Sequence, residues 1–226
     1  MVRWMTEPDA PAGPGGLIRL DDVRAALALD GFDPLEARRA MSPAPRVLHR
    51  PDTRPGEPLQ ASVIVLLFPG EHGLSFPLIH RAEHPGDVHS GQISLPGGSR
   101  EPGESPVDTA LREASEELGV GAGVEILGEL SPLYVAPSDF EVTPFVGWLP
   151  ARPRWRSDER EVVEVLECSL AWLFEARLKH VEDWAFEGYS LRVPWYDVTG
   201  HRVWGATAIL LGELEQRLRR TLNGRL

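Results

Sequence analysis

A glycine-rich loop followed directly by an acidic helix constrains this chain more than any other feature of its sequence. Ser105, Pro106 and Asp108 have the pattern of an N-cap, a first-turn proline and a capping-box partner. Gly119 suits the position just past the end of a helix. The pattern therefore predicts a helix over residues 106–118.

The two faces of this predicted helix differ. One carries apolar residues at helical spacing, which we expect to be buried: Val107, Ala110, Leu111, Ala114 and Leu118. Glu113, Glu116 and Glu117 lie three and four residues apart on another stripe. Carboxylates this close repel one another unless a cation offsets their charge, and Mg²⁺ and Mn²⁺ prefer oxygen ligands. The alternative is an ordinary exposed face on which Arg112 and solvent satisfy the glutamates.

The motif is longer than a pair of glutamates. It fits the pattern Gly-x5-Glu-x7-Arg-Glu-(apolar)-x-Glu-Glu-x-Gly-(apolar), and its residues are Gly98, Glu104, Arg112, Glu113, Glu116, Glu117, Gly119 and Val120. This pattern resembles the signature of the Nudix hydrolases. Ala114 stands where that family usually has Ile, Leu or Val, which indicates tighter packing beneath the helix.

The resemblance implies an α/β (α+β) fold, an alpha-beta-alpha sandwich around a mixed β-sheet. It also implies a divalent-metal-dependent hydrolase of a nucleoside diphosphate linked to another group. Carried over residue by residue, it makes Glu113, Glu116 and Glu117 metal ligands and the Gly98 carbonyl a further one.

The resemblance gives two further residues a supporting role. Arg112 is expected to orient the glutamates by charge-assisted hydrogen bonds, with Glu104 in the same network. Metal ions in such a site neutralise the phosphate oxygens, position the diphosphate and acidify the attacking water. The general base stays open between Glu117 and Glu161, because in this superfamily it comes either from the helix or from a distant loop.

Segments outside the signature resemble the coenzyme A pyrophosphatase branch of the family. In that branch an upstream arginine and a His-x-Gly-Gln stretch precede Pro-Gly-Gly. The matching segments here are 89–98, 133–134, 137–138, 143–147 and 203–207. The branch implies cleavage of coenzyme A or acyl-coenzyme A to adenosine 3′,5′-bisphosphate and 4′-phosphopantetheine.

One position departs from the branch. An arginine there lies four residues before the glycine that corresponds to Gly91, and this chain has Asp87 instead. The missing cation matters because coenzyme A carries an additional 3′-phosphate. Arg81, Arg100, His80 or His89 could replace it. The expected substrate-binding residues are Arg81, His89, Arg100 and Gly97. The alternatives are ADP-ribose, NADH or another dinucleotide as substrate, or a non-catalytic domain that senses a nucleotide.

Composition agrees with a globular enzyme. With 226 residues, of which 42% are hydrophobic, the chain can bury one substantial core. We expect an N-terminal extension over residues 1–55, with a helical segment, and the Nudix domain over 56–226. A formal net charge of −11 argues against nucleic-acid or anionic-membrane partners. We expect a cytoplasmic location, because no segment approaches the roughly 20 apolar residues of a membrane span, and a homodimer is possible.

The remaining pattern predicts the other elements coarsely. A helical region interrupted near Gly31 is expected over 17–39, a helix over 170–176, a hairpin over 184–195 and a closing helix over 206–222. Strands are expected over 61–68, 74–80, 92–95, 124–127, 143–148 and 161–166. Three readings stay open: His89 contacts phosphate or stabilises a turn, the loop at 137–140 faces the substrate or only turns the chain, and Trp204 is a core residue or a substrate platform.

Overall fold

The computed structural model describes residues 2–4, 18–46, 49–83, 89–120, 122–158, 160–186 and 188–223. The helices are α1 Leu20–Leu27, α2 Pro34–Arg38, α3 Pro106–Leu118 and α4 Gly205–Leu222, with the 3₁₀ helices η1 Arg39–Met41, η2 Leu170–Phe174 and η3 Ala176–Leu178. The strands are β1 Val2–Trp4, β2 Leu59–Gly70, β3 Gly73–Arg81, β4 Ile93–Ser94, β5 Gly97–Ser99, β6 Glu125–Glu129, β7 Leu133–Val135, β8 Phe140–Trp148, β9 Val162–Ser169, β10 Lys179–Phe186, β11 Tyr189–Val198 and β12 His201–Val203.

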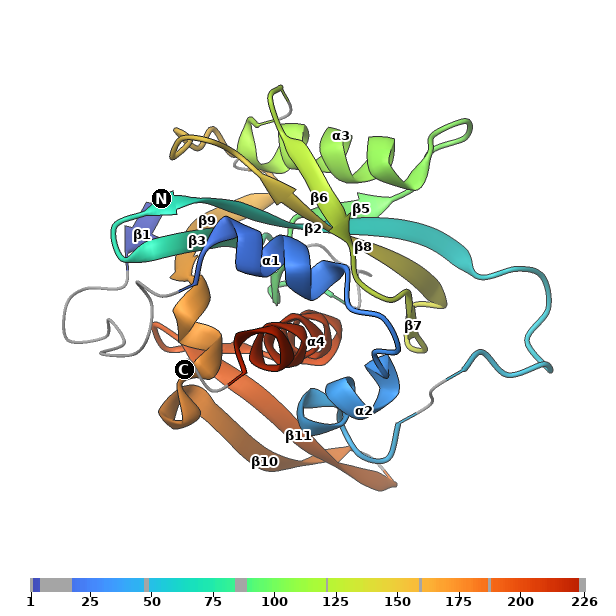
Figure 1. Cartoon of the computed structure of the whole chain (residues 1–226). Coiled ribbons are helices and arrows are strands. Elements are labelled where there is room, and N and C mark those ends of the chain that lie inside the picture. Colours follow the sequence, from blue (N-terminus) through green and yellow to red (C-terminus); the bar gives the residue numbers. More distant parts are fainter. Residues whose placement is uncertain are drawn as a thin grey trace.

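Among these residues, nine strands form one mixed sheet (Figure 1). Its main path runs β1-β9-β3-β2-β8-β6, and β4, β5 and β7 pair with β3, β2 and β8. The β1–β9 and β2–β8 pairs are parallel and the other pairs are antiparallel. The predicted mixed sheet is therefore confirmed.

The side chains of β2 show how the layers are built. Ile64, Leu66 and Phe68 belong to the core on the α3 side, whereas Val65 and Leu67 belong to the core on the α4 side. All five are completely buried, as expected for a central strand covered on both faces. Helix α3 covers one face of the sheet, and α1 and α4 cover the other (Figure 1). This arrangement confirms the predicted alpha-beta-alpha sandwich.

A second sheet adds a layer that the sequence did not predict. Strands β10, β11 and β12 form it, and α4 lies between this sheet and the large one (Figure 1). Tyr196 and Val198 of β11 are completely buried in the same core as α4. The hairpin predicted over 184–195 is confirmed and extends over 179–198.

One expectation about local structure was wrong and another is confirmed. The segment at 170–176 is not an α-helix but part of two short 3₁₀ helices, η2 and η3. Residues 170–173 are all buried. The segment therefore lacks the solvent-facing polar side that an amphipathic helix would have. The predicted break near Gly31 is confirmed, because α1 and α2 are separate helices.

The large sheet divides at one end. β2 and β3 pair only near their turn, where Phe68–Gly70 lies opposite Gly73–Ser75. Farther from the turn, β4 pairs with β3 while β5 pairs with β2. The chain from Ile93 to Ser99 therefore crosses from one arm of a fork to the other.

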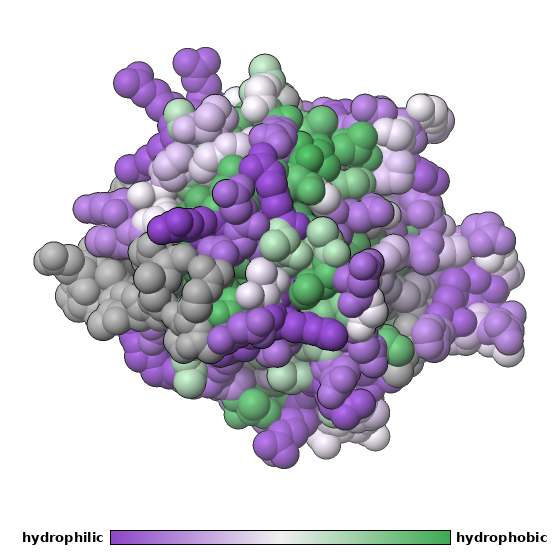
Figure 2. All heavy atoms as spheres, viewed as in Figure 1, coloured by the Kyte–Doolittle hydropathy of each residue, from purple (hydrophilic) through white to green (hydrophobic). Residues whose placement is uncertain are grey.

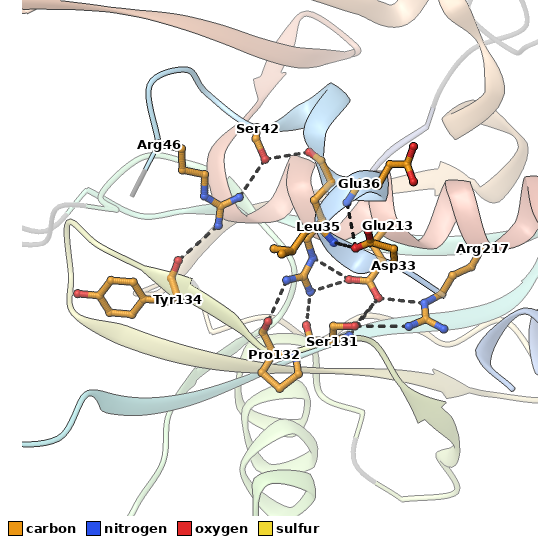
Figure 3. A network of polar contacts seen from close by, with 11 residues as sticks. Asp33, Leu35, Glu36, Ser42, Arg46, Ser131, Pro132, Tyr134, Glu213 and Arg217 are labelled. Carbon is orange, nitrogen blue, oxygen red and sulfur yellow. Dashed lines mark hydrogen bonds and ion pairs between the residues drawn. The ribbon is translucent and has the colours of Figure 1, made fainter. Parts of the chain in front are cut away.

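A buried ion-pair network joins the N-terminal segment to α4 (Figure 3). The Glu213 carboxylate, fully buried, lies 2.6 Å from Arg38 Nη2 and 2.9 Å from Arg217 Nε. It also accepts a hydrogen bond from the Ser131 backbone N–H at 3.1 Å. This network fixes α2, α4 and the loop before β7 relative to one another.

The surface and the helices bear on how the protein meets its surroundings. The face seen in Figure 1 is mostly hydrophilic, with hydrophobic atoms visible in the gaps between polar side chains (Figure 2). Within the described part of the chain, no helix combines the length and apolarity that crossing a bilayer requires.

Candidate active site

Helix α3 begins and ends where the sequence predicts. The Ser105 hydroxyl accepts a hydrogen bond from the Asp108 N–H at 3.2 Å, and Asp108 accepts one from the Ser105 N–H. At the other end Gly119 has φ 72°, and a Cβ there would lie 2.7 Å from the Arg156 Cβ. The sequence therefore fixes the register of the acidic stripe along the helix.

Two glycines of β5 bring the backbone close to this helix. A Cβ on Gly97, whose φ is 148°, would lie 2.3 Å from the Ser62 carbonyl oxygen. A Cβ on Gly98 would lie 2.4 Å from Glu113 Oε1. Larger residues would displace the β2 backbone in the first case and the Glu113 carboxylate in the second.

Arg112 lies at the centre of the exposed side of the site. Its Nη1 lies 2.9 Å from both Glu113 Oε1 and Glu116 Oε2, and its Nε donates to Glu104 Oε1 at 2.7 Å. A further bond from Nη2 reaches the Ser99 carbonyl at 2.9 Å. Hydrogen bonding to Arg112 lowers the pKa of Glu104 to about 2. Arg112 and Glu104 thus make the contacts expected of orienting residues.

Glu117 is the most deeply placed of the three helix carboxylates. Its side chain is 3% exposed, against 13% for Glu113 and 53% for Glu116. Glu117 Oε2 accepts a hydrogen bond from the Gly97 N–H at 2.8 Å, and Oε1 lies 3.5 Å from Arg81 Nη1. Burial raises the pKa of Glu117 to about 8, although the Gly97 N–H opposes the shift.

Glu161 joins this cluster from another part of the chain. It is exposed just before β9, and its carbonyl accepts a hydrogen bond from the Ala82 N–H at 2.8 Å, next to the end of β3. Repulsion from Glu161 helps to raise the pKa values of Glu113 and Glu117, after the larger effect of burial. The structure therefore brings both candidate bases, Glu117 and Glu161, to one place.

The expected substrate-binding residues lie in different settings. Arg81 is beside Glu117 in the cluster. His89 Nε2 lies 3.0 Å from Ser138 Oγ, and His89 Nδ1 lies 3.4 Å from Gln92 Oε1. Arg100 is exposed just after β5, where its N–H donates to the Gln60 carbonyl.

Other sequence expectations have mixed outcomes. The His80 ring packs edge-on against that of His201, with centroids 5.3 Å apart. Trp204 is half-buried and packs edge-on against Trp184, with ring centroids 4.8 Å apart. Asp87 lies outside the described residues.

Sequence reasoning missed a group of arginines near Ser138. Arg50 and Arg54 both form ion pairs with Asp139. They belong to no motif, and the predicted extension gave no reason to place them near residues 130–140. Only their repeated spacing with Arg46 could have drawn attention to them.

The acidic cluster fits a divalent cation by its chemistry. Within the described ranges, no three His, Cys, Asp or Glu side chains already surround a common point as metal ligands. Arg112 Nη1 instead lies between Glu113 and Glu116. The donors are hard carboxylate oxygens, and burial, with a smaller contribution from mutual repulsion, raises the pKa values of Glu113 and Glu117. A cation would offset both effects.

Comparison with known proteins agrees with this geometry. The NUDIX domain family model matches residues 58–189. The chain is 37% identical over 145 residues to the uncharacterized Nudix hydrolase NudL of Yersinia pestis (strain Pestoides F), covering 62% of this chain and 71% of NudL. NudL of Yersinia pseudotuberculosis serotype O:1b (strain IP 31758) gives the same values.

Solved structures give more distant matches. The MutT protein from Methanosarcina mazei Go1 is 19% identical, with a TM-score of 0.49, covering 74% of this chain and 98% of that one. The MutT/nudix family protein from Enterococcus faecalis is 18% identical, with a TM-score of 0.48, covering 77% and 67%. The family match and the NudL relatives, together with the signature on α3, show that this chain belongs to the Nudix hydrolases, which act on pyrophosphate bonds and generally use divalent metals.

Proposed function

We propose that this protein is a Mg²⁺- or Mn²⁺-dependent pyrophosphohydrolase that cleaves the diphosphate of coenzyme A or an acyl derivative. The products are adenosine 3′,5′-bisphosphate and 4′-phosphopantetheine. The observation that carries the proposal is the cluster of Glu113, Glu116 and Glu117 on α3 in a Nudix chain, in which Glu113 and Glu117 face the β5 glycines. These carboxylates, with the Gly98 carbonyl, are the groups that would hold the metal.

A bound divalent cation supplies charge neutralisation of the diphosphate and a more acidic attacking water. The residues of the chain orient the groups around the diphosphate. Arg112 holds Glu113 and Glu116 at equal distances from its Nη1, and Glu104 anchors Arg112 from the opposite side. Because all three contacts are charge-assisted, the carboxylates are positioned before the substrate arrives.

The proton acceptor is either Glu117 or Glu161. Glu117 is buried and bonded to the Gly97 N–H, which limits its movement. Glu161 is exposed and lies on a loop, so it can approach an attacking water from the solvent side. Glu161→Gln separates the two roles, because a base is needed for turnover but not for metal binding.

The choice of coenzyme A rests on the resemblance of residues 89–98 and of the later segments to the coenzyme A pyrophosphatase branch. Two arginines are available for its phosphates. Arg81 lies at the carboxylate cluster with 29% of its side chain exposed, and Arg100 is exposed just beyond β5. Histidine 89 lies between these arginines in the sequence, on the turn that leads into β4.

The test is Mg²⁺-dependent product release from equal concentrations of coenzyme A, dephospho-coenzyme A, ADP-ribose and NADH, resolved by chromatography. We expect preferential cleavage of coenzyme A. Preference for ADP-ribose, NADH or another dinucleotide would retain the hydrolase and replace the substrate. No turnover of any of them would favour a non-catalytic nucleotide-sensing domain.

The same proposal takes the enzyme to act on a small molecule in the cytoplasm. Size-exclusion chromatography with light scattering tests whether the chain forms the possible homodimer: a mass of about twice 25.0 kDa would support it, and a mass of about 25.0 kDa would exclude it.

A further inference from the structure

Arginines from the segment before β2 reach one short stretch of chain, residues 131–139. Arg38 donates to the Ser131 and Pro132 carbonyls, and Arg46 donates to the Tyr134 carbonyl at 3.4 Å (Figure 3). Arg54 donates to the Ala136 carbonyl at 3.0 Å. Arginine side chains, and not only the neighbouring strands, therefore hydrogen-bond to the backbone of this stretch.

Asp139 is the anchor at the end of the stretch. Arg50 binds it with two parallel contacts, Nε to Oδ1 at 2.8 Å and Nη2 to Oδ2 at 2.9 Å. Arg54 Nη1 lies 3.2 Å from Oδ1, and the Tyr134 hydroxyl donates to Oδ1 at 2.9 Å. Two-point contacts between guanidinium and carboxylate fix orientation as well as distance. Asp139 also has φ 58°, a conformation that Asp and Asn adopt more readily than most residues.

The residue before this anchor, Ser138, contacts the turn that precedes β4. Ser138 Oγ lies 3.0 Å from His89 Nε2. The turn at 89–92 lies against β3, because the Gln92 carbonyl accepts a hydrogen bond from the Arg81 N–H at 3.0 Å. Arg81 in turn lies beside Glu117. A continuous set of contacts thus leads from Asp139 to the edge of the carboxylate cluster.

We propose that Asp139 is a positioning residue for substrate recognition. Arg50 and Arg54 hold Asp139 in place, and Asp139 in turn fixes the position of Ser138. Ser138 then holds the turn that carries His89 beside the candidate active site. The group recognised there is the polar part of the substrate beyond the diphosphate, since the diphosphate itself belongs to the α3 carboxylates. This inference rests on the proposed function.

The first test does not depend on activity. Backbone hydrogen exchange is measured on the full chain as wild type, Asp139→Asn and Ser138→Ala. Asn keeps the size of Asp and suits the same backbone conformation, so the fold is expected to persist. We expect faster exchange at residues 89–92 in both variants. Unchanged exchange there would overturn the inference whether or not the protein is an enzyme.

The second test is kinetic. For Asp139→Asn we expect KM for the preferred nucleoside diphosphate to rise about tenfold, with kcat within about twofold, because recognition is lost while the α3 carboxylates are intact. The double variant Ser138→Ala/Asp139→Asn should be no worse than Ser138→Ala, because Asp139 acts through Ser138. Additive losses, or a fall in kcat with KM unchanged, would contradict the proposed role.

The matched control is Glu182→Gln, which removes the Glu182–Arg202 ion pair of 3.1 Å on the second sheet. It should change neither the exchange at residues 89–92 nor KM. If the wild type cleaves no nucleoside diphosphate, the proposed function fails, and so does the proposed role of Asp139 in substrate recognition. If the wild type is active and Asp139→Asn keeps its KM, only the inference fails.

Discussion

Individual carboxylates in this protein differ because their surroundings differ. Glu117 is buried against a backbone N–H, whereas Glu116 is one residue away and about half-exposed. Glu104 is held by Arg112 and stays ionised far below neutral pH. Three glutamates of one motif thus have different surroundings. Glu117 is buried, Glu116 is exposed, and Glu104, which precedes the helix, anchors Arg112.

Glu116→Gln tests the metal-ligand prediction with little risk to the fold. The side chain is 53% exposed, so the free energy of unfolding should change by no more than about 0.5 kcal/mol. We expect kcat to fall by about 100-fold or more, because an anionic ligand is lost. Steady-state kinetics checks this, with Glu36→Gln on the exposed side of α2 as the control. Near wild-type turnover would refute the ligand assignment.

Asp139 gives a prediction for pH. Arg50 lowers its pKa in the folded protein to about 2, below the ordinary value of 3.8. The ionised group therefore stabilises the fold above about pH 4, and this contribution is lost as the pH falls toward 2. The difference in unfolding free energy between wild type and Asp139→Asn should shrink from pH 5 to pH 2, as measured by urea unfolding. A difference that is constant with pH would show that the ion pair does not stabilise the fold.

At the scale of elements, β5 connects packing with chemistry. Its two glycines are adjacent, yet Gly97 faces the β2 backbone and Gly98 faces the Glu113 carboxylate. The sequence predicted a loop here, because Pro-Gly-Gly is a turn signal and contains no residue with a strand preference. Pairing with β2 gives the segment its extended form, and such long-range pairing is absent from a local pattern.

Alanine at each glycine should therefore have a different effect. Gly97→Ala places a methyl group against the Ser62 backbone and should lower the free energy of unfolding by about 1–3 kcal/mol. Gly98→Ala meets the Glu113 carboxylate, and its main effect should be on kcat. Thermal unfolding and kinetics of both variants check this contrast. Equal effects on stability and on kcat would contradict it.

At the scale of the whole molecule, the segment before β2 and helix α4 share a core, to which Val23, Ala26 and Met41 contribute. Glu213 of α4 is fully buried between two arginines, one from α2 and one from α4 itself. Glu213→Gln would leave two buried guanidinium groups without their carboxylate. We expect a loss of about 3–5 kcal/mol in the free energy of unfolding.

Urea unfolding measures this loss, and Glu36→Gln again serves as the control because Glu36 is exposed on the neighbouring α2. A loss below about 1 kcal/mol would show that water replaces the missing carboxylate. The division of the chain into residues 1–55 and 56–226 remains a prediction, and separate expression of the two segments would test it.

Local patterns predicted what depends on neighbours in sequence. The limits of α3 followed from Ser105, Pro106 and Gly119, and the strand β2 followed from its apolar run. The second sheet around α4 and the arginines that hold Asp139 depend on contacts between distant segments. No single sequence reveals such contacts, because an exposed arginine and an anchoring arginine have the same local pattern.

The fork in the large sheet has a mechanical consequence. Strand β5 is paired with β2, while the turn carrying His89 is joined through β4 to β3, so the two sides of the candidate site belong to different arms. The arms are hydrogen-bonded to each other only near the β2–β3 turn. The spacing between the β4 arm and the β5 arm therefore depends on the twist of the β2–β3 hairpin as well as on the side chains beside α3.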